Sequence, residues 1–453
     1  MITSAAVRTA WLATVLVTAA GASARANPAA IVPSGGEGGT AGDFSVDYEY
    51  ELDRALITRE RAGDPSADPL GPPPKHDDLQ FSSFRHTLTP RLDVGVYHDT
   101  WATIALPIII TQARELRLAS GVDRTMSPTL QDGYLPQAGY DAQDPSTPPS
   151  GDLVFRGQDR KGIPELRFGL GFAPMNQRRD DTKPTWKLGA DFHLAVGRAM
   201  RFDRMAPGAE TGVSDGVHKL TLWTTMDRKL GFYEPWIKLA WTVPLAARST
   251  SLFQDPGFGA TNVMPGQIAA AQFGVELYAV DDKVEHNSLS IELSGRVKAH
   301  FEGRGYSEMW EAFAYAGDAR VAGNPLILDA DPTTAGVQAV SHPGISDIEN
   351  YLEVGGSVAI RAQLGPRVHV AATVDVFKIT DHVISFAAAG IDLPTCGTAG
   401  AGTNCEPDAN DVVNPGTKEI NPAAAPAIDR VGSRYHSEQN LGLVLGITGE
   451  ILF

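Results

Sequence analysis

The chain ends on residues 439–453, Q-N-L-G-L-V-L-G-I-T-G-E-I-L-F, and this stretch decides the fold. An apolar set occupies every second position from Leu441 to Phe453, with Gly449 as its one small member. The positions between them are mostly small or polar, as at Glu450. Because successive side chains of a strand point to opposite faces, the stretch predicts a strand with one apolar and one polar face.

An apolar strand that ends on the carboxylate of an aromatic residue resembles the C-terminal strand of bacterial outer-membrane β-barrels. The resemblance is to the broad class and not to a named subfamily. It implies that Phe453 is the signal read by the barrel-assembly machinery, and that outer-membrane lipid surrounds the folded chain.

The first 26 residues have the pattern of an export signal. Arg8 supplies a positive charge, residues 9–20 are an apolar run, and Ala24 and Ala26 form a cleavage site of the A-x-A type. A membrane-spanning helix is the less favoured alternative, since the run falls short of the ~20 residues that a bilayer requires. We expect a signal peptide at 1–26, a flexible periplasmic lead-in at 27–43 and a barrel at 44–453.

Composition agrees with a barrel but does not require one. The chain has 453 residues, 43% of them hydrophobic, and a mean hydropathy of -0.13. A barrel can have such values because every second residue of each strand faces the lumen. The formal net charge of -16 argues against nucleic acid as a partner.

Eleven further alternating segments precede the last one, beginning at residues 44–53, and short connections alternate with long ones. Neither a β-sandwich nor a propeller predicts this alternation. In bacterial barrels the short turns are periplasmic and the long loops extracellular. We therefore predict an all-β fold, a 12-stranded antiparallel transmembrane β-barrel with periplasmic termini. Its six long extracellular loops are 59–78, 115–162, 201–215, 249–267, 303–350 and 379–438.

The inward parity of the strands carries charges of both signs. The basic candidates for the lumen wall are Arg85, Arg91, Arg167, Lys187, Lys219, Lys238, Arg296, Lys298, Arg361 and Arg367. The acidic candidates are Asp47, Glu49, Glu51, Asp53, Asp93, Glu165, Asp191, Glu276, Glu292, Glu353, Asp375 and Glu450. Such a balanced wall predicts either a wet pore with opposed charged ladders or a lumen closed by ion pairs, and twelve strands leave room for both.

Two ladders of like charge stand out on this wall. The first strand places Asp47, Glu49, Glu51 and Asp53 on neighbouring inward positions, and the ninth places Arg296, Lys298 and His300 there. Unpaired, the acidic ladder would attract cations and the basic ladder would steer an anion. The favoured alternative is pairing: Arg85 and Arg91 would serve the acidic ladder, and Glu353 and Glu276 the basic one.

Aromatic residues near the short turns predict an interfacial girdle. They are Tyr97, Trp101, Trp186, Phe232, Tyr233, Trp236 and Phe453. Two of them, Trp101 and Trp236, fall on the inward parity, so either the strands begin after them or the register changes there.

Two of the long loops carry candidate recognition features. Tyr306, Trp310, Phe313 and Tyr315 have the spacing of one helical face and predict a constriction, a plug or an outer cap. Cys396 and Cys405 lie in one Gly-rich loop and predict a local disulfide, with metal ligation as the weaker reading.

We find no convincing catalytic, metal or cofactor motif and expect that the protein is not an enzyme. His436 and Ser437 are adjacent, so on a strand they would point in opposite directions and could not readily share a proton. The sequence best fits a porin-like channel for passive, weakly selective passage of small hydrophilic solutes. The alternative is a non-conducting barrel with an ion-paired lumen that acts in surface recognition or structure.

Overall fold

The structure is a computed structural model that describes residues 42–61, 72–254, 264–329, 339–386 and 425–453. The expected signal peptide, nearly all of the lead-in and the cysteines at 396 and 405 lie outside these residues. None of the helices in the described ranges is long and apolar enough to cross a membrane.

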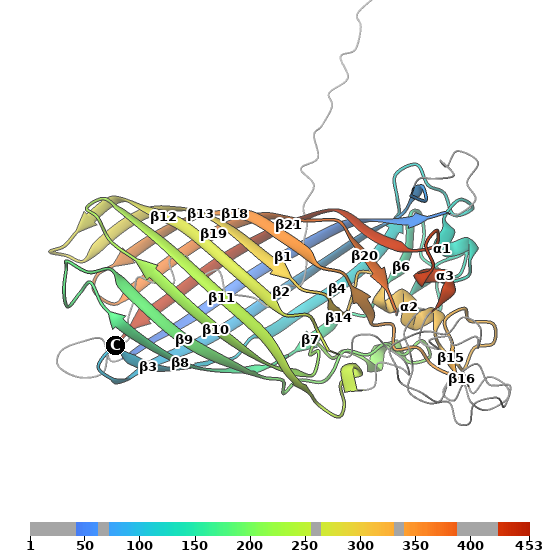
Figure 1. Ribbon diagram of the computed structural model, residues 1–453, viewed down its shortest axis with the longest axis horizontal. Helices are drawn as coiled ribbons and strands as arrows, with labels where there is room; N and C mark the ends of the chain where they lie inside the picture. Colours follow the sequence, from blue (N-terminus) through green and yellow to red (C-terminus); the bar gives the residue numbers. More distant parts are fainter. Residues whose placement is uncertain (1–41, 62–71, 255–263, 330–338, 387–424) are drawn as a thin grey trace, which may run out of the picture.

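Twelve long antiparallel strands form a closed barrel, as the alternating sequence predicts (Figure 1). They are β1 (Gly42–Glu60), β2 (Lys75–Tyr97), β3 with β4 (Thr100–Ala105 and Ile108–Leu118), β8 (Leu166–Met175), β9 (Thr185–Leu194), β10 (Val217–Asp227), β11 (Tyr233–Ala247), β12 (Ile268–Asp282), β13 (Asn287–His300), β18 (Tyr351–Leu364), β19 (Val368–Ile379) and β21 (Tyr435–Leu452). The ring closes because β21 pairs with β19 on one side and with β1 on the other.

Both ends of the described chain meet at one rim of the barrel. The amide of Gly42 donates to the carbonyl of Phe453 at 3.1 Å, and the amide of Phe453 donates back at 3.0 Å. Figure 1 shows this rim at the left, where short turns join the strands, and we call it the short-turn end. Its assignment to the periplasm stays a prediction.

The opposite rim, which we call the long-loop end, carries the shorter elements (Figure 1). They are α1 (Pro128–Gln131), β5 (Tyr140–Asp141), β6 (Leu153–Arg156), β7 (Arg160–Gly162), η1 (Pro207–Ala209), η2 (Leu252–Gln254), β14 (Gly303–Gly305), α2 (Trp310–Ala316), β15 (Leu328–Asp329), β16 (Ala339–Val340), β17 (Ser346–Ile348), β20 (His382–Ser385) and α3 (Pro426–Asp429). The sequence predicted loops for the residues of these short helices and strands. Several of these strands instead extend the sheet, as β20 does by pairing with β21.

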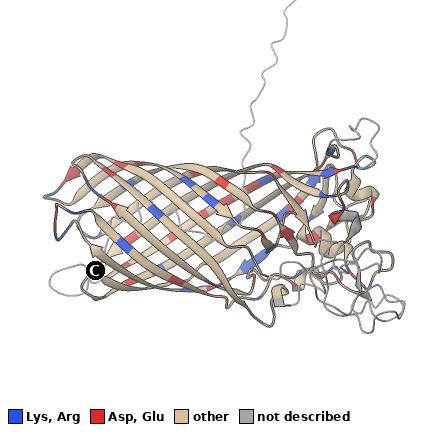
Figure 2. Cartoon of the chain, in the orientation of Figure 1, with Lys and Arg blue, Asp and Glu red and all other residues tan. Residues whose placement is uncertain are grey.

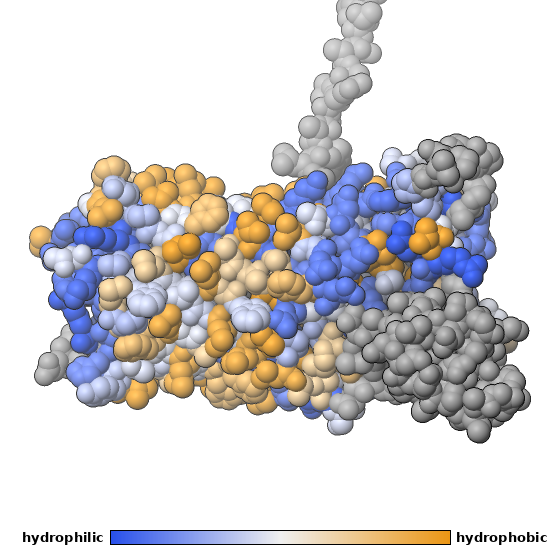
Figure 3. Space-filling view, viewed as in Figure 1, coloured by the Kyte–Doolittle hydropathy of each residue, from blue (hydrophilic) through white to orange (hydrophobic). Residues whose placement is uncertain are grey.

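The barrel wall is apolar outside and polar inside. On β13, Leu289 and Ile291 are 42% and 45% exposed, whereas Ser290 and Glu292 between them are 1% and 2% exposed. Apolar residues gather over the strands, and hydrophilic ones gather at the short-turn end (Figure 3). Hydrocarbon tolerates a sheet only when it closes and leaves no unpaired edge. The chain therefore has the fold of a membrane-spanning β-barrel.

Trp101 and Trp236 correct the predicted girdle. Both rings point into the barrel and are buried, whereas Tyr97 and Phe232 at the same end are largely exposed. A Cβ atom at Gly171 would lie only 2.2 Å from the ring of Trp101. The tryptophans thus fill space over glycines of neighbouring strands. Both lie within their strands, and the pairing of β2 with β3 shifts register beside Trp101, whereas no shift lies at Trp236.

Gly442 on β21 is packed in the same way, under an aromatic ring of the neighbouring strand β19. A Cβ atom there would lie 2.0 Å from the Phe377 ring of β19. We expect Gly442→Ala to lower the free energy of unfolding by about 1–3 kcal/mol, the usual cost of overpacking. Denaturant unfolding in detergent micelles measures it.

Gly449 on the same strand is the matched control, since a Cβ atom there meets nothing within 4 Å. Gly449→Ala should leave stability nearly unchanged, and Phe377→Ala added to Gly442→Ala should recover part of the loss. Equal effects of the two glycine substitutions would contradict the packing described.

Candidate functional site: a charge-lined lumen below a packed plug

The acidic ladder of β1 faces the lumen and is partly paired by its neighbours. Asp47 and Asp53 are each 2% exposed. Arg85 of β2 forms an ion pair with Glu51, and Thr448 of β21 donates to Asp47 at 2.7 Å. The expected partner Arg91 is instead bound to Asp93 of its own strand at 2.7 Å.

The basic ladder of β13 surrounds Glu353 of β18. Arg296 Nη2 and Lys298 Nζ lie 2.7 and 3.0 Å from Glu353 Oε1, and His300 Nε2 lies 3.6 Å from Oε2. Arg296 also contacts Asp375 of β19 at 2.9 Å. Glu353 is fully buried, so this carboxylate is the centre of the ladder's charge compensation.

Glu276 does not serve the basic ladder, contrary to the expected pairing. It accepts from Arg361 of β18 at 3.1 Å, and Glu292 accepts from the same guanidinium at 2.6 Å. The reason is register: Glu276 of β12 lies directly across from Glu292 of β13, below the level of Arg296. Arg361 therefore bridges two carboxylates of adjacent strands.

The remaining predicted wall residues divide into two groups. Arg167 pairs with Glu165 at 2.6 Å, Lys187 is buried, and Asp191 and Lys238 line a cavity in the middle of the lumen. Arg367 does not belong to the wall. It is exposed in the turn between β18 and β19, because the strand begins only at the next residue.

Basic and acidic residues are spread over the barrel strands (Figure 2). Cavities follow one another along the lumen. The cavity at the short-turn end has a volume of about 660 Å³, and the middle cavity about 110 Å³. A third, of about 290 Å³, lies toward the long-loop end, and we call it the upper chamber. The middle cavity and the upper chamber share lining residues, among them Arg167 and Thr242.

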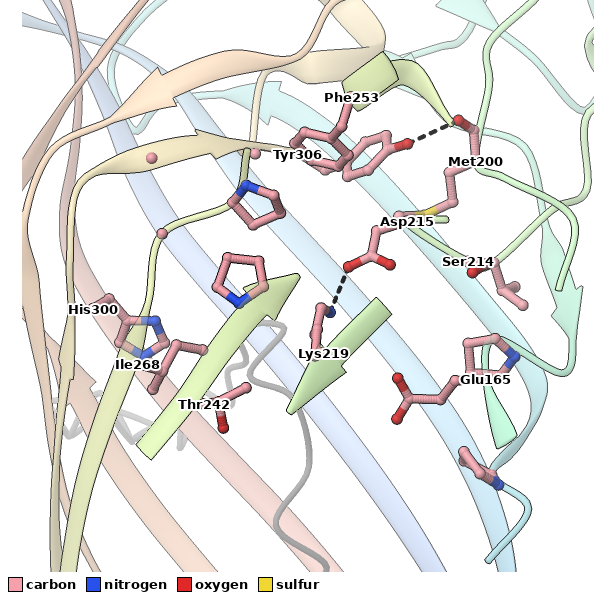
Figure 4. Close-up of a pocket in the computed structure, with 18 of the residues that line it drawn as sticks. Glu165, Met200, Ser214, Asp215, Lys219, Thr242, Phe253, Ile268, His300 and Tyr306 are labelled. Atoms are coloured by element: carbon pink, nitrogen blue, oxygen red, sulfur yellow. Dashed lines mark hydrogen bonds and ion pairs between the residues drawn. The ribbon is translucent and has the colours of Figure 1, made fainter. Parts of the chain in front are cut away.

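The upper chamber combines ion pairs with apolar surface (Figure 4). Lys219 Nζ contacts Asp215 Oδ2 at 2.5 Å. Tyr306 donates from its hydroxyl to the carbonyl of Met200 at 3.0 Å, and its ring lies edge-on to Phe253, with 5.7 Å between the centroids. The chamber can therefore hold a solute that has both polar and apolar parts.

A hydrophobic core fills the long-loop end above the upper chamber, and we call it the plug. Helix α2 supplies Phe313 and Tyr315 to this core. Trp310 of the same helix is also buried, and Arg160 lies over its ring, 5.0 Å from the centroid. The partners of the helix in this core come from wall strands and from other loops, and include Ile57, Leu79, Phe81, Leu116, Tyr134, Phe155, Phe386 and Tyr435. Of the four aromatic residues predicted to share one helical face, Tyr306 precedes the helix and lines the chamber below it.

Buried charges fix the plug to the wall. Arg160 Nη2 contacts Glu311 Oε1 at 2.6 Å, and the two side chains are 1% and 4% exposed. Arg160 also donates to the carbonyl of Glu210 at 2.9 Å, and Arg114 of β4 donates to the carbonyl of Ser307 at 3.1 Å. Sequence reasoning missed these residues because they lie in stretches without periodicity or at the end of a strand.

His436 and Ser437 bind different partners. His436 Nε2 lies 3.0 Å from Glu60 Oε1, whereas Ser437 donates to Glu308 Oε1 at 3.0 Å. They do not form a Ser-His pair. Within the described ranges, no group of three or more His, Cys, Asp or Glu residues could hold a metal ion.

No family model matches the chain, and no curated protein matches it. Solved structures that resemble it include an outer membrane channel from Pseudomonas putida F1, with 9% identity, a TM-score of 0.39 and coverage of 91% of this chain and 96% of that one. A Pseudomonas aeruginosa FadL homologue has 8% identity and a TM-score of 0.32, with coverage of 91% of this chain and 90% of that one. The outer membrane protease OmpT of Escherichia coli has 7% identity and a TM-score of 0.26, with coverage of 91% of this chain and 97% of that one. At these identities and TM-scores the resemblance carries no argument about function.

The pair of Arg160 and Glu311 makes the plug sensitive to one charge. Glu311→Gln leaves a buried guanidinium without its carboxylate, so we expect it to lower the free energy of unfolding by about 3–5 kcal/mol. Asp203→Asn is the control, because Asp203 pairs at 2.6 Å with Arg320, whose side chain is 53% exposed. Such an exposed pair contributes below ~1 kcal/mol. Denaturant unfolding in micelles compares them, and equal losses would contradict the account.

His342 makes the plug sensitive to acid. Burial, and then the charge of Arg304, lower the pKa of His342 to about 3, and its Nδ1 accepts from the amide of Gly344 at 2.9 Å. The pKa of His342 in the folded protein lies below its ordinary value of 6.5. The neutral imidazole therefore contributes to the stability of the plug above about pH 6.5, and this contribution is lost as the pH falls toward 3.

Limited proteolysis at pH 7.5 and pH 4.5 measures this effect. We expect faster cleavage in the plug at the lower pH, and a smaller difference in His342→Asn, whose amide oxygen can still accept from Gly344. A difference unchanged by this substitution would show that other groups cause the acid sensitivity.

Proposed function

We propose that the protein is a transport channel of the outer membrane that passes small hydrophilic solutes with little selectivity for charge, and that the plug controls its entrance at the long-loop end. The observation that carries the proposal is the series of cavities along the lumen, of about 660, 110 and 290 Å³, which charged and polar side chains line together with apolar ones. A barrel that served only as a scaffold would not need them.

Weak selectivity follows from how the wall charges are arranged. Arg361 stands between Glu276 and Glu292, and Glu353 compensates Arg296 and Lys298. A solute therefore meets paired charges of both signs, and not a ring of one sign such as makes a channel selective for cations or anions.

Control at the long-loop end follows from the packing of the plug. Phe313 is fully buried among residues of the wall and of other loops. Trp310 is also fully buried, and the guanidinium groups of Arg114 and Arg160 lie over its ring. Polar solutes cannot cross such a core, so passage requires α2 and its neighbours to move. We expect closed and open periods with the plug in place.

A specific observation favours a second candidate, a non-conducting barrel. On β13, Ser290 lines the cavity at the short-turn end and Lys298 lines the middle one. Glu292 and Arg296 lie between them, both held by ion pairs at 2.6–2.9 Å. If this layer does not open, the lumen is divided, and the protein acts in surface recognition or structure.

Single-channel recording in planar bilayers tests the proposal. We expect low conductance from the native chain and several-fold higher conductance from Trp310→Ala, which opens a cavity in the plug and costs about 3–5 kcal/mol. The permeabilities for K⁺ and Cl⁻ should be similar in both. Phe232→Ala, on an exposed turn residue, is the control and should resemble the native chain.

Three other outcomes would decide against parts of the proposal. High conductance of the native chain would contradict control by the plug, and strong preference for one ion would contradict the balanced wall. No conductance and no liposome swelling with either protein would support the second candidate.

A further inference from the structure

We propose that the upper chamber binds a small organic cation, a molecule with a protonated amine at one end and an apolar body. The amine would enter a small polar annex of the chamber beside the plug. This inference goes beyond the proposed function, because binding can be measured whether or not the lumen conducts.

The annex is a cavity of about 40 Å³ with two acidic side chains on its wall, Asp53 of β1 and Glu308. It adjoins the upper chamber, since both are lined by Arg114, Tyr306 and Tyr351. One water molecule takes up ~30 Å³ in the liquid. The annex therefore has the size of one small polar group.

Each of these carboxylates has one oxygen free to accept a hydrogen bond. Asp53 Oδ1 and Glu308 Oε2 are buried and have no hydrogen-bond partner among the described residues. Asp53 is 2% exposed and the side chain of Glu308 is 8% exposed. A buried carboxylate oxygen without a donor costs free energy, and an ammonium group carries three N–H donors.

Charge balance in the annex favours a cation. Arg114 and His382 are the basic side chains on its wall. The imidazole of His382 lies 3.9 Å from Glu308 Oε1 and is charged only when protonated, and Glu311 is already paired with Arg160. With His382 neutral, Asp53 and Glu308 thus share one positive charge among the described side chains of the annex, that of Arg114. A proton could supply the missing charge, so the test must separate a bound amine from a protonated acid.

The rest of the upper chamber does not offer a comparable site for an anion. Lys219 lies 2.5 Å from Asp215 and Arg167 lies 2.6 Å from Glu165, so each of these cations already has a carboxylate partner. An anionic ligand would have to break these pairs. A cation entering the annex breaks none.

The remaining wall suits an apolar body. Met200, Phe253 and Ile268 line the upper chamber in the view of Figure 4. Tyr306 and Tyr351 flank both the chamber and the annex, and aromatic faces attract organic cations. A volume of about 290 Å³ is close to the lower limit of small-molecule pockets, ~300 Å³. The ligand is therefore one ring or a short chain.

Calorimetric titration of the full chain in detergent micelles tests the proposal, with phenethylamine as the probe. We expect saturable binding, and binding weaker by about tenfold or more for 2-phenylethanol and 3-phenylpropionate, which lack the charge-assisted donors. Asp53→Asn and Glu308→Gln should each weaken the binding of phenethylamine by a similar factor. Glu292→Gln, which removes a lumen charge outside the annex, should leave the affinity nearly unchanged.

A comparison on the native chain keeps the proposal testable if the variants do not fold. Trimethylated phenethylammonium has the same charge but a head too large for about 40 Å³, so it should bind about tenfold more weakly or worse. Equal affinity for the two heads, equal affinity for amine and alcohol, or an equal loss in Glu292→Gln would each overturn the annex as the site. Absence of saturable binding would also overturn it and would leave the conductance results unaffected.

Discussion

The structure depends on one constraint, that every backbone amide and carbonyl within hydrocarbon must have a partner. A sheet meets it only by closing on itself. Here the closing contact is the pairing of β1 with β21, which runs from Asp43 opposite Leu452 to Arg59 opposite Tyr435. The stretch that decides the fold in the sequence is thus one half of the seam that completes the ring.

Closure also sets the character of the lumen. Because side chains alternate, a wall that satisfies lipid outside must put its remaining residues inside, and here many of these are charged. Burying them singly would be costly, so they pair, and Glu353 with Arg296 and Lys298 is the densest example. The same pairing that makes the wall stable removes any strong preference for one sign of charge.

The two ends of the barrel differ in how they meet water. At the short-turn end the lumen has a cavity of about 660 Å³, while at the long-loop end a core of aromatic and aliphatic residues closes it. The plug is built like the interior of a soluble domain, with Arg160 and Glu311 as its buried pair. The packing of the plug therefore controls access to the upper chamber, and the paired charges of the wall control passage through the lumen below it.

The sequence predicted what alternation and loop length encode. It predicted the strand count, the closing strand, the inward side of β1 and β13, and the pairing of Arg296 with Glu353. It indicated a plug as one of three readings of the aromatic residues at 306–315. It did not predict the partners of the plug, because Phe313 contacts Phe386 and Tyr435, which lie far from it in the chain. It misplaced Trp101 and Trp236 because a tryptophan near a turn is usually interfacial, whereas here each covers a glycine.

Cross-linking across the seam tests closure of the barrel most directly. With Cys396 and Cys405 replaced by Ser, the pair Val46→Cys and Gly449→Cys places thiols on directly opposed residues of β1 and β21, within the range that a disulfide spans. Oxidation in membranes should join them within one chain, while Phe44→Cys with Gly449→Cys, out of register, should stay unlinked. Failure of the opposed pair to link, or linking of both pairs alike, would contradict a barrel closed in this register.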